Sequence, residues 1–558
     1  MSSNIAEIAI ESGHGLHDGE TRRRSRRLAP GVIGVCLVMV LASSLALVLV
    51  PGARASPGSP YATVKVPCGA SIQAAINAAH PGDTIVLAKC TYTEQLTITK
   101  SITIMGAGAG RTIIQSPAVL GLDAFGNPWT IEIGGAATVA MSGFTLVVTP
   151  QCIISSPGAV SGVSGYAGGG IGVGGSATLN LRSAVVTTTG QTEGAPCDSG
   201  AGFMSYGTGV DFGLDYVTGS PAASQLVGFG TVSGVTVYGF GFGGPEVAVG
   251  GVADSPAGSY ALISNDRITA TVNQVSGFSY GVGVGLGGYA SSATIVDNVL
   301  TAAPGTVSFT VWVGFGSSAY IAHNWIAGSG WADAVTIAFS ASATITGNAI
   351  AAVTPTSGYN GIGVYFAGAV TITYNSISAA VAGWGIYLDA SSATIEFNTI
   401  SQFECSYSAS ELASFGITCG PDWYYQDQGY GIMDYVDAGL GTTIANNLVY
   451  ASDVGVVLLH ACPGCVVKDN VVQTNYWGLA GIDGTFTFSH DTVIGGEYGV
   501  AAIADGCPCD YNAVVTLDHF VMFGQTGAPP PLLPPPFYYE VDPPGLSATI
   551  GGTWSFYP

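Results

Sequence analysis

Four polar side chains follow a recurring glycine and are the residues best suited to chemistry: Asp389, Asp434, His460 and Asp483. If successive repeats of the chain stack on one another, these side chains lie near one corner of the stack. A pair of carboxylates there could serve as general acid and general base in glycoside cleavage. Their offsets from the glycine differ, so chance placement on a surface is the alternative interpretation.

A second polar column lies one residue before a recurring asparagine. An Asp and a His on neighbouring repeats could hold a metal ion or exchange a proton. Polar residues at an exposed turn need no such role, and the turn interpretation stays open beside it. The column consists of Asp297, His323, Tyr374, Asn446, Asp469 and His490, with His519 as an extension.

The element that must position both columns is a repeat between Ile263 and Val493. Its phrase is apolar, any, any, Asn or Asp, any, apolar, as in Ile295-Val-Asp-Asn298-Val-Leu300. Two short β-rich segments in each period of about 20–30 residues, without helical periodicity, predict an all-β parallel β-helix in which each repeat is one coil. One coil cannot bury its apolar face alone, so neighbouring coils must stack.

Stacking gives the recurring asparagine a structural role. Coils about 4.8 Å apart bring equivalent side chains together, so we predict a ladder of amide hydrogen bonds. Asn also tolerates a left-handed turn conformation. The expected ladder residues are Asn298, Asn324, Asn348, Asn375, Asn398, Asn447 and Asn470.

Aromatic residues before the recurring glycine should form a further column. Its members include Trp384, Tyr430 and Trp477. We expect either packing against the turn or a surface on which sugar rings stack.

The composition suits β-coils and limits the partners. Only 9% of the residues are charged, 48% are hydrophobic, 82 are glycines, and the net charge is −22. Nucleic acids and anionic membranes require a basic surface, so both are excluded as partners. A strongly anionic polysaccharide would need a bridging cation, and a calcium ion is therefore the only cofactor considered. Low charge also suits an acidic external medium.

The first 55 residues are typical of an export signal. They contain a basic run at 22–27, an apolar run at 31–50, and the small-residue motif Ala53-Arg54-Ala55. Cleavage after Ala55 would release a secreted or cell-surface protein. If cleavage does not occur, the apolar run is long enough to anchor the chain in a membrane.

The remainder divides into three parts. Residues 56–63 form a linker, 64–524 the β-helix, and 525–558 a proline-rich tail with a strand candidate at 550–556 that could cap the last coil.

Cysteine usage agrees with export. Of the 11 cysteines, Cys36 lies in the leader, and the even number that remains indicates disulfides. The pairs closest in sequence are Cys68–Cys90, Cys152–Cys197 and Cys405–Cys419. Four others lie in Cys462-Pro-Gly-Cys465 and Cys507-Pro-Cys509, where an oxidising compartment favours disulfides over a zinc site.

A short helix should cover the first coil. Ser71 is a good N-cap, one face carries Ile72, Ala75, Ile76 and Ala79, and Pro81-Gly82 ends the helix. Such a helix would cover an otherwise exposed apolar edge.

From this helix onward the sequence resembles the pectin-lyase-like superfamily of right-handed parallel β-helix proteins. The phrases that carry the resemblance are Ser71-Ile-Gln-Ala-Ala-Ile-Asn-Ala-Ala79, Gly82-Asp-Thr-Ile-Val-Leu87, Thr91-Tyr-Thr-Glu94 and Ser101-Ile-Thr-Ile-Met-Gly106. The later Ile-x-x-Asn phrases are similar to carbohydrate-associated β-helix repeats. The resemblance covers residues 64–521 and implies a single right-handed parallel β-helix with an N-terminal capping helix.

The resemblance implies no single activity, because the superfamily includes lyases, hydrolases, esterases, epimerases, copper-site maturation proteins and non-catalytic adhesins. The catalytic motifs of its pectin methylesterases and polygalacturonases are absent here, and few basic residues remain for a lyase. The leading prediction is a secreted β-helix protein that binds extracellular polysaccharide and could cleave it as a lyase or glycoside hydrolase. The rival is a non-catalytic cell-surface or adhesive scaffold. Copper maturation is disfavoured, because Met and His are sparse.

Overall fold

The structure is a computed structural model. It describes residues 61–118, 120, 129–148, 166–189, 205–212, 228–240, 245–249, 258–271, 280–287, 290–302, 307–328, 333–352, 359–378, 383–403, 429–435, 441–460, 464–504, 512–526, 537–541 and 546–557. All of them belong to one unit, residues 60–558. The predicted leader lies outside the described residues.

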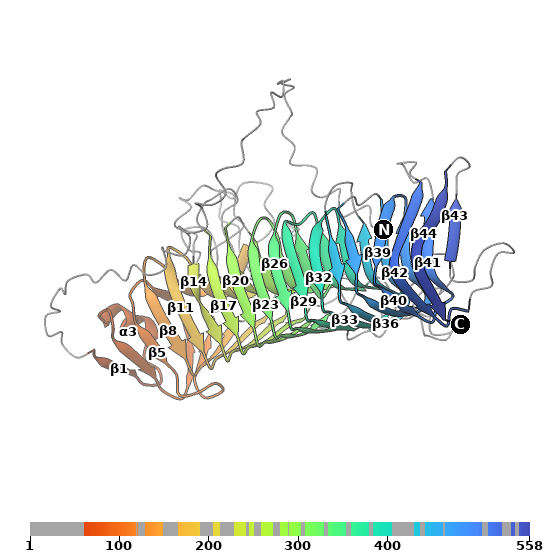
Figure 1. Cartoon of the computed structure of the whole chain (residues 1–558). Helices are drawn as coiled ribbons and strands as arrows, with labels where there is room; N and C mark the ends of the chain where they lie inside the picture. The colour runs from red at the N-terminus through yellow and green to blue at the C-terminus, as the bar shows by residue number, and fades with distance from the viewer. Residues whose placement is uncertain are drawn as a thin grey trace, which may run out of the picture. The chain divides into compact units, whose positions relative to one another are not determined.

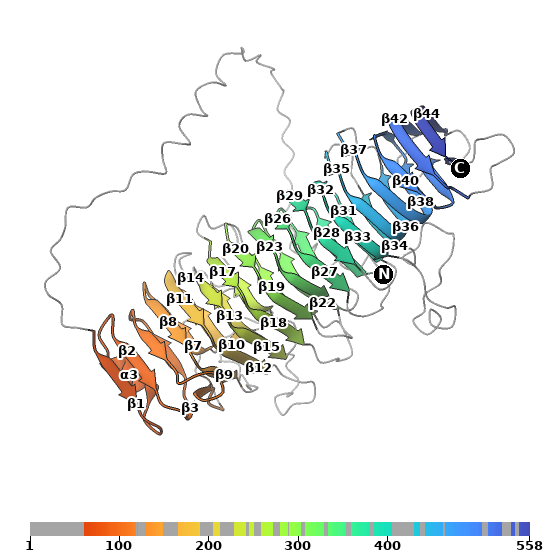
Figure 2. The same cartoon turned by 60° about the horizontal axis from the view of Figure 1, so that its bottom comes forward.

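Three faces of parallel strands make up this unit (Figures 1 and 2), and nearly every strand pairs with the equivalent strand one coil later. The first face contains β1 (Thr63–Val66), β2 (Thr84–Leu87), β5 (Thr103–Met105), β8 (Thr138–Ser142), β11 (Ala177–Arg182), β14 (Gly228–Ser233), β17 (Tyr260–Ser264), β20 (Ser292–Val296), β23 (Ser318–Ala322), β26 (Ser342–Thr346), β29 (Ala369–Thr373), β32 (Ser392–Glu396), β35 (Thr443–Ala445), β37 (Val466–Lys468), β39 (Thr485–Ser489), β42 (Ala513–Phe523) and β44 (Ala548–Tyr557).

The second face follows the first in each coil, and from residue 267 onward its strands begin directly after the recurring Asn or Asp. It contains β3 (Thr91–Thr93), β6 (Ile113–Gln115), β9 (Thr145–Val148), β12 (Val185–Thr189), β15 (Thr236–Phe240), β18 (Arg267–Thr271), β21 (Val299–Ala302), β24 (Trp325–Gly328), β27 (Ala349–Ala352), β30 (Ser376–Ser378), β33 (Thr399–Phe403), β36 (Leu448–Leu459), β38 (Val471–Ile482) and β40 (Thr492–Ile494).

The third face carries the recurring glycine. It contains β4 (Leu96–Ile98), β7 (Trp129–Ile133), β10 (Tyr166–Val173), β13 (Ser205–Phe212), β16 (Pro245–Val249), β19 (Tyr280–Leu286), β22 (Val307–Val313), β25 (Val335–Ala338), β28 (Tyr359–Tyr365), β31 (Gly383–Asp389), β34 (Gly429–Tyr435), β41 (Tyr498–Ala504) and β43 (Phe537–Val541). The long strands β36 and β38 bend from the second face into the third, and β42 and β44 bend from the first into the second.

The core lies inside the coils and is built from columns of like residues. Ile295 pairs with Ile321, Ile321 with Ile345, and Ile345 with Ile372, and all four are fully buried. Side chains alternate between the two sides of a strand, so each strand directs every second residue inward. Together the coils form one continuous aliphatic core.

The asparagine column lies inside the coils as a continuous hydrogen-bonded ladder. Asn298 N donates to Asn324 Oδ1 at 2.9 Å, and the same bond recurs on each coil until Asn470 N donates to Asp491 Oδ1 at 2.8 Å. Each amide nitrogen also donates to the next Oδ1, at 2.9–3.1 Å. The left-handed conformation, which we expected at the asparagine, instead belongs to the residue before it, such as His323 at φ 56°.

The N-terminal end is capped by α3 (Ile72–Ala78), as the sequence predicted (Figure 1). Ser71 Oγ accepts from Ala74 N at 3.0 Å, and Ile72 and Ile76 are buried against the first coil. Glu94 accepts from Ser71 Oγ and from Ile72 N, both at 2.8 Å. At the other end, Lys100 Nζ donates to Asn77 O at 2.7 Å, so each terminus of the helix has a side-chain partner from a segment that follows a neighbouring strand.

The stack continues past residue 524, where the sequence interpretation placed its end. Strand β43 pairs with β41 on the third face. Strand β44, which contains the strand candidate predicted at 550–556, pairs with β42 with one irregularity between Leu517 and Phe520. Within the part of the chain that the structure describes, no helix is long and apolar enough to cross a membrane.

The cysteines differ from expectation at one predicted pair. Cys68 and Cys90 are both free thiols, so the predicted Cys68–Cys90 disulfide is not formed here. A hydrogen bond with the Cys90 side chain raises the pKa of Cys68, so the two thiols are neighbours in their reduced form. Cys465 is disulfide-bonded. The other expected disulfide residues lie outside the described ranges: Cys152, Cys197, Cys405, Cys419, Cys462, Cys507 and Cys509.

Candidate functional site

The four residues predicted for acid–base chemistry occupy three different positions along the strand direction. Asp434 pairs with Leu388 and Leu458, whereas Asp389 pairs with Tyr435, one position later. Leu459 and Ile482 occupy the position of Tyr435 and Asp389 on the next two coils. His460 and Asp483 follow them directly and therefore lie one position further along the strand direction. The register therefore does not bring the four side chains to one point, and their catalytic role stays a prediction.

Asp434 points into the coil instead of toward solvent. It is 0% exposed and takes the place that leucine holds on both neighbouring coils. Burial raises the pKa of its carboxyl to about 7, and a hydrogen bond with Thr442 opposes this shift. Cys465 Sγ lies 3.8 Å from its Oδ2. A polysaccharide on the surface cannot reach this carboxyl.

The other three residues lie at or beyond the end of third-face strands. Asp389 is half-buried, whereas Asp483 is 0% exposed. His460 and Asp483 both have left-handed backbones, with φ of 53° and 50°. The His460 ring packs edge-on against Tyr435, with centroids 5.1 Å apart. These neighbours on adjacent coils form a packed corner.

The three predicted sugar-stacking residues align as expected, but two of them are buried. Trp384 pairs with Tyr430, Tyr430 with Val454, and Val454 with Trp477. Tyr430 is only 5% exposed and Trp477 only 1%, within a second apolar cluster on the outer side of the third face. Neither ring is accessible to a sugar, so the packing alternative holds for both. Half-buried Trp384 stacks on Tyr430, with centroids 6.1 Å apart.

An exposed column runs along the edge between the first and second faces, and we call it the left-handed corner. Each non-glycine member has φ between 51° and 58°, because it turns the chain just before the next second-face strand. Apart from that of His519, each backbone N–H of the column donates to a carbonyl of the next coil, as His323 N does to Thr346 O at 3.2 Å. His519 N donates to Thr553 Oγ1 at 2.8 Å. The members are Asn265, Asp297, His323, Gly347, Tyr374, Phe397, Asn446, Asp469, His490 and His519. This geometry supports the turn interpretation of the second polar column.

The middle of the left-handed corner carries aromatic rings and one histidine. Tyr374 and Phe397 are 63% and 44% exposed, and their rings stack with centroids 5.0 Å apart and planes within 5°. His323 Nδ1 lies 3.9 Å from Asp297 Oδ1. An added Cβ on Gly347 would lie 2.7 Å from His323 Cδ2, so the imidazole leans over the glycine between His323 and Tyr374.

Two more exposed rings flank His323. Tyr320 on β23 is 44% exposed, and Trp325 on β24 is 45% exposed. Their register neighbours are smaller, for example Thr344 beside Tyr320 and Ala349 beside Trp325, which leaves the rings standing above the surface. We call the set Tyr320, His323, Trp325, Tyr374 and Phe397 the aromatic corner.

Sequence reasoning singled out only His323 and Tyr374 of this set. Phe397 could have been found, because it precedes Asn398 as Tyr374 precedes Asn375. Tyr320 and Trp325 occupy outward positions on either side of the turn, which the alternation of the strands also predicts.

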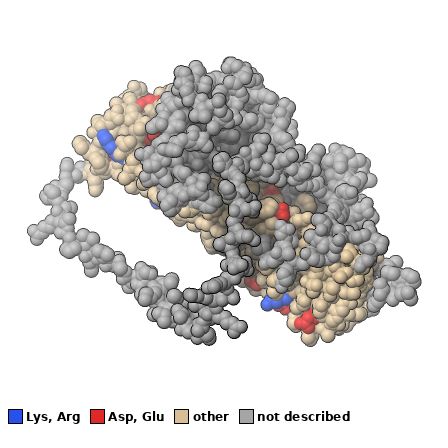
Figure 3. All heavy atoms as spheres, turned by 90° about the horizontal axis from the view of Figure 1, so that it is seen from above, with Lys and Arg blue, Asp and Glu red and all other residues tan. Residues whose placement is uncertain are grey.

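The surface around these rings has little charge. By register, the acidic residues nearest to them are Asp297 and Glu396. Figure 3 shows the molecule from above, where few of the described residues are Lys, Arg, Asp or Glu. Rings flanked by threonine hydroxyls can pack on an apolar face of a ligand and hydrogen-bond its edge. The site therefore suits a ligand with hydroxyl groups and little charge.

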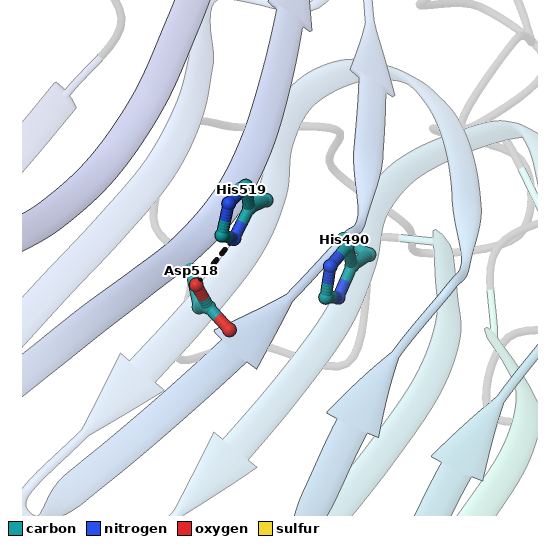
Figure 4. Close-up of side chains that lie close together, drawn as sticks. All are labelled: His490, Asp518 and His519. Carbon is teal, nitrogen blue, oxygen red and sulfur yellow. Dashed lines mark hydrogen bonds and ion pairs between the residues drawn. The ribbon is translucent and has the colours of Figure 1, made fainter.

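The C-terminal part of the left-handed corner carries a different group of side chains (Figure 4). The rings of His490 and His519 stack with centroids 5.1 Å apart and planes within 1°. Asp518 Oδ1 lies 2.6 Å from His519 Nδ1. One ligand atom from each of the three residues lies within 4.8 Å of the other two. Among the described residues, this cluster is the candidate for holding a metal ion.

Comparison with known proteins identifies the fold. Residues 311–514 match the model of the right-handed β-helix region, which is less than half of the chain. The chain thus has the right-handed parallel β-helix fold that the resemblance to the pectin-lyase-like superfamily implied, and that prediction is confirmed. A comparison with curated proteins finds no match.

Several solved structures are similar in part. An alginate lyase from Paenibacillus sp. is 13% identical, covers 69% of this chain and 94% of its own, and has a TM-score of 0.31. A mannuronan C-5 epimerase module from Azotobacter vinelandii is 12% identical to this chain. The match covers 87% of this chain and 94% of the module, with a TM-score of 0.23. Tailspike protein 2 of the Escherichia coli O157:H7 bacteriophage CAB120 is 13% identical to this chain. The match covers 69% of this chain and 42% of the tailspike, with a TM-score of 0.33. No substrate or reaction follows from values this low.

Proposed function

We propose that this chain is a secreted or cell-surface β-helix protein that binds an extracellular polysaccharide of low charge along the aromatic corner. The observation that carries the proposal is the grouping of four exposed rings and His323 within four successive coils at one edge of the stack. Single exposed apolar residues are ordinary on protein surfaces, whereas a contiguous group marks an interaction site. Trp and Tyr are enriched at such sites, because they combine a large apolar face with a polar group.

The geometry of the corner suits a chain-like ligand. Coils follow one another at about 4.8 Å, so rings on successive coils form a row parallel to the stack. Tyr374 and Phe397 lie on neighbouring coils, and their ring centroids are 5.0 Å apart. A polymer lying along the row could contact several coils at once, and each contact would add to the binding free energy.

The charge of the site favours a neutral polymer. Near the rings, the first face carries Glu396, and Asp297 lies 3.9 Å from His323. Among the described residues, no lysine or arginine forms an ion pair with either carboxylate. The two would therefore repel an anionic sugar chain unless a cation lay between them. A polysaccharide without carboxylate or sulfate groups therefore fits best.

Binding without cleavage agrees with the positions of the acidic residues. Asp434 lies in the core, and Asp389, His460 and Asp483 lie on the third face, away from the aromatic corner. Glycoside hydrolysis ordinarily uses two carboxyl groups that flank one bond, at most about 9.5 Å apart. Asp297 and Glu396 lie four coils apart, about 19 Å at the usual coil spacing. We therefore expect binding of polysaccharide without release of products.

The experiment is a binding screen followed by ring removal. The full chain is tested against soluble neutral and anionic polysaccharides by affinity electrophoresis and calorimetry, with product analysis in parallel. We expect neutral polymers to bind, and Tyr374→Ala with Trp325→Ala to weaken binding at least about tenfold, which is ~1.4 kcal/mol. Phe366→Ala is the matched control, since Phe366 is 55% exposed with a left-handed backbone at another edge.

Two results would contradict the proposal. One is equal binding by the double variant and the unmodified chain, which would remove the aromatic corner as the site. The other is the absence of binding to every polysaccharide in the screen, which would favour the adhesive-scaffold alternative.

A further inference from the structure

Three side chains near the C-terminal end converge without any part in the proposed polysaccharide site. His490 follows β39, while Asp518 and His519 lie within β42 on the next coil. Figure 4 shows the two imidazoles side by side from adjacent strands, with Asp518 directed at His519. His490 N donates to Asp518 O at 2.7 Å, so the backbone itself holds the two coils in register at this point.

The position of the histidines follows from the repeat. Both have left-handed backbones, with φ of 58° and 51°, and therefore occupy the same place on successive coils. Their side chains are largely exposed, at 71% for His519, and Asp518 is 48% exposed. Exposed rings on fixed backbones can turn toward a common ligand without disturbing the core, which begins with buried Leu517 and Phe520.

The charge around the cluster favours a cation. Asp469 occupies the left-handed corner one coil before His490, and its backbone N donates to Ser489 O at 3.0 Å. Lys468 pairs with Ser489, which in turn pairs with Asp518, so the lysine lies two coils from that carboxylate. Lys468 also precedes Asp469 and lies one coil from His490, so Asp469, Asp518 and Lys468 together place one net negative charge beside the histidines.

We propose that His490, His519 and Asp518 bind one divalent transition-metal ion of the zinc class. Two imidazole nitrogens and one carboxylate oxygen form a borderline ligand set, which suits Zn²⁺ and its neighbours and not Ca²⁺, an ion that takes six to eight oxygens. The three ligand atoms lie within 4.8 Å of one another, so small rotations of exposed side chains bring them around one ion. Three protein ligands leave a position for water.

Such an ion would join the last two coils on which the left-handed corner is described. His490 and His519 belong to different coils, so a shared ligand ties β39 to β42 near the C-terminal end of the stack. Binding to the folded chain alone stabilises it by mass action. The ion is therefore expected to raise the unfolding temperature as well as to bind.

The test uses Zn²⁺ itself with the full chain, freed of metal by a chelator. The background variant is Cys68→Ser with Cys90→Ser, so that these two free thiols cannot bind zinc. Calorimetry should detect an equivalent of zinc that is lost when both His490→Asn and His519→Asn are introduced, with each single change weakening it at least about tenfold. Asparagine is chosen because Asn446 already holds this left-handed position. Zinc should also raise the unfolding temperature of the background chain, and a chelator should reverse the increase.

The control is His80→Ala, since His80 Nδ1 lies 3.7 Å from Asp83 Oδ2 on an exposed turn far along the sequence. It should leave zinc binding unchanged. Equal zinc affinity in the double His→Asn variant and the background chain would overturn the proposal. So would an unfolding temperature that zinc raises equally in both.

Discussion

Asn348 shows at the scale of one residue how a single side chain joins three coils. Its Nδ2 donates to Ile321 O at 2.9 Å on the preceding coil and to Asn375 Oδ1 at 2.9 Å on the following coil. Its Oδ1 accepts from both Asn324 N and Asn324 Nδ2, at 2.9 and 3.0 Å. Because the site is 2% exposed, water cannot replace these bonds.

We expect Asn348→Ala to lower the free energy of unfolding by about 2–4 kcal/mol, because two buried donors of Asn324 lose their acceptor. Urea denaturation followed by circular dichroism measures the loss. Ser376→Ala is the control: Ser376 is exposed on the neighbouring second-face strand, and its truncation should change stability by no more than about 0.5 kcal/mol. Equal effects of the two substitutions would mean that the ladder contributes no more than a surface residue.

At the scale of the element, α3 depends on side chains that reach it from the strands. The first N–H groups of a helix have no partner within the helix. Here Glu94, just after β3, accepts from Ile72 N and Gln73 N at 2.8 and 3.1 Å. Lys100 supplies the matching contacts at the C-terminal end, including Ala79 O at 3.0 Å. The cap is thereby attached to the coil that it covers.

Glu94→Ala should loosen this cap by about 1–2 kcal/mol, the usual cost of losing a capping side chain. Amide hydrogen exchange of residues 72–76 should become faster, while exchange in β26 should not change. Glu94→Gln retains an acceptor and should have a smaller effect. If exchange in α3 stayed as slow in the alanine variant, packing of Ile72 and Ile76 alone would account for the cap.

Most of these elements could be predicted from the sequence, because their signals are local. The Ile-x-x-Asn phrase indicates the strand, the turn and the ladder together, and Ser71 marks the start of the helix. The accessibility of Tyr430 and Trp477 could not be predicted in this way. Regular alternation would place these rings inside the coil, because each lies two residues before a core residue, Ile432 or Leu479. They belong instead to a second apolar cluster, whose burial depends on packing beyond the strand itself.

The candidate sites were only partly predictable for a similar reason. Tyr374, His323, His490 and His519 stand out, because one position in each repeat recurs. The offsets of Asp389 and Asp434 from the glycine differ by one residue, and in a strand one residue reverses the side to which a side chain points. That single step places Asp434 in the core and removes it from any surface site.

At the scale of the whole molecule, the stack contains buried carboxyl groups for which burial favours the protonated, uncharged form. Asp266 and Asp491 stand at the two ends of the described ladder, and Asp434 replaces a core leucine. Burial raises the pKa of each of the three carboxyls to about 7. Among the described residues, Oδ2 of Asp266 and of Asp491 has no hydrogen-bond partner, which agrees with a proton on the carboxyl.

These shifts predict that the protein is more stable in mild acid than at neutral pH. An unfolded aspartate releases its proton near pH 3.8, whereas the folded groups keep theirs up to about pH 7. Between these values the folded state binds more protons, so the free energy of unfolding falls as pH rises, by at most about 1.4 kcal/mol per pH unit for each group. Above about pH 7 this contribution is constant. Asp83 acts in the opposite direction, because hydrogen bonds from His80 N and Ala62 N lower its pKa, and its contribution is lost in stronger acid.

Urea denaturation at pH 4.5, 5.5, 6.5 and 7.5 measures the slope, and a matched variant isolates its source. Asp266→Asn and Asp491→Asn keep an acceptor in the ladder, and Asp434→Leu adopts the residue found on both neighbouring coils. The triple variant should gain stability at pH 7.5 and lose most of the pH dependence, because it has no carboxyl to deprotonate at these sites. If the free energy of unfolding of the triple variant changed with pH as steeply as that of the unmodified chain, these three carboxyls would not be the cause. The higher stability in acid would then come from reduced repulsion among the surface carboxylates of a chain with a net charge of −22.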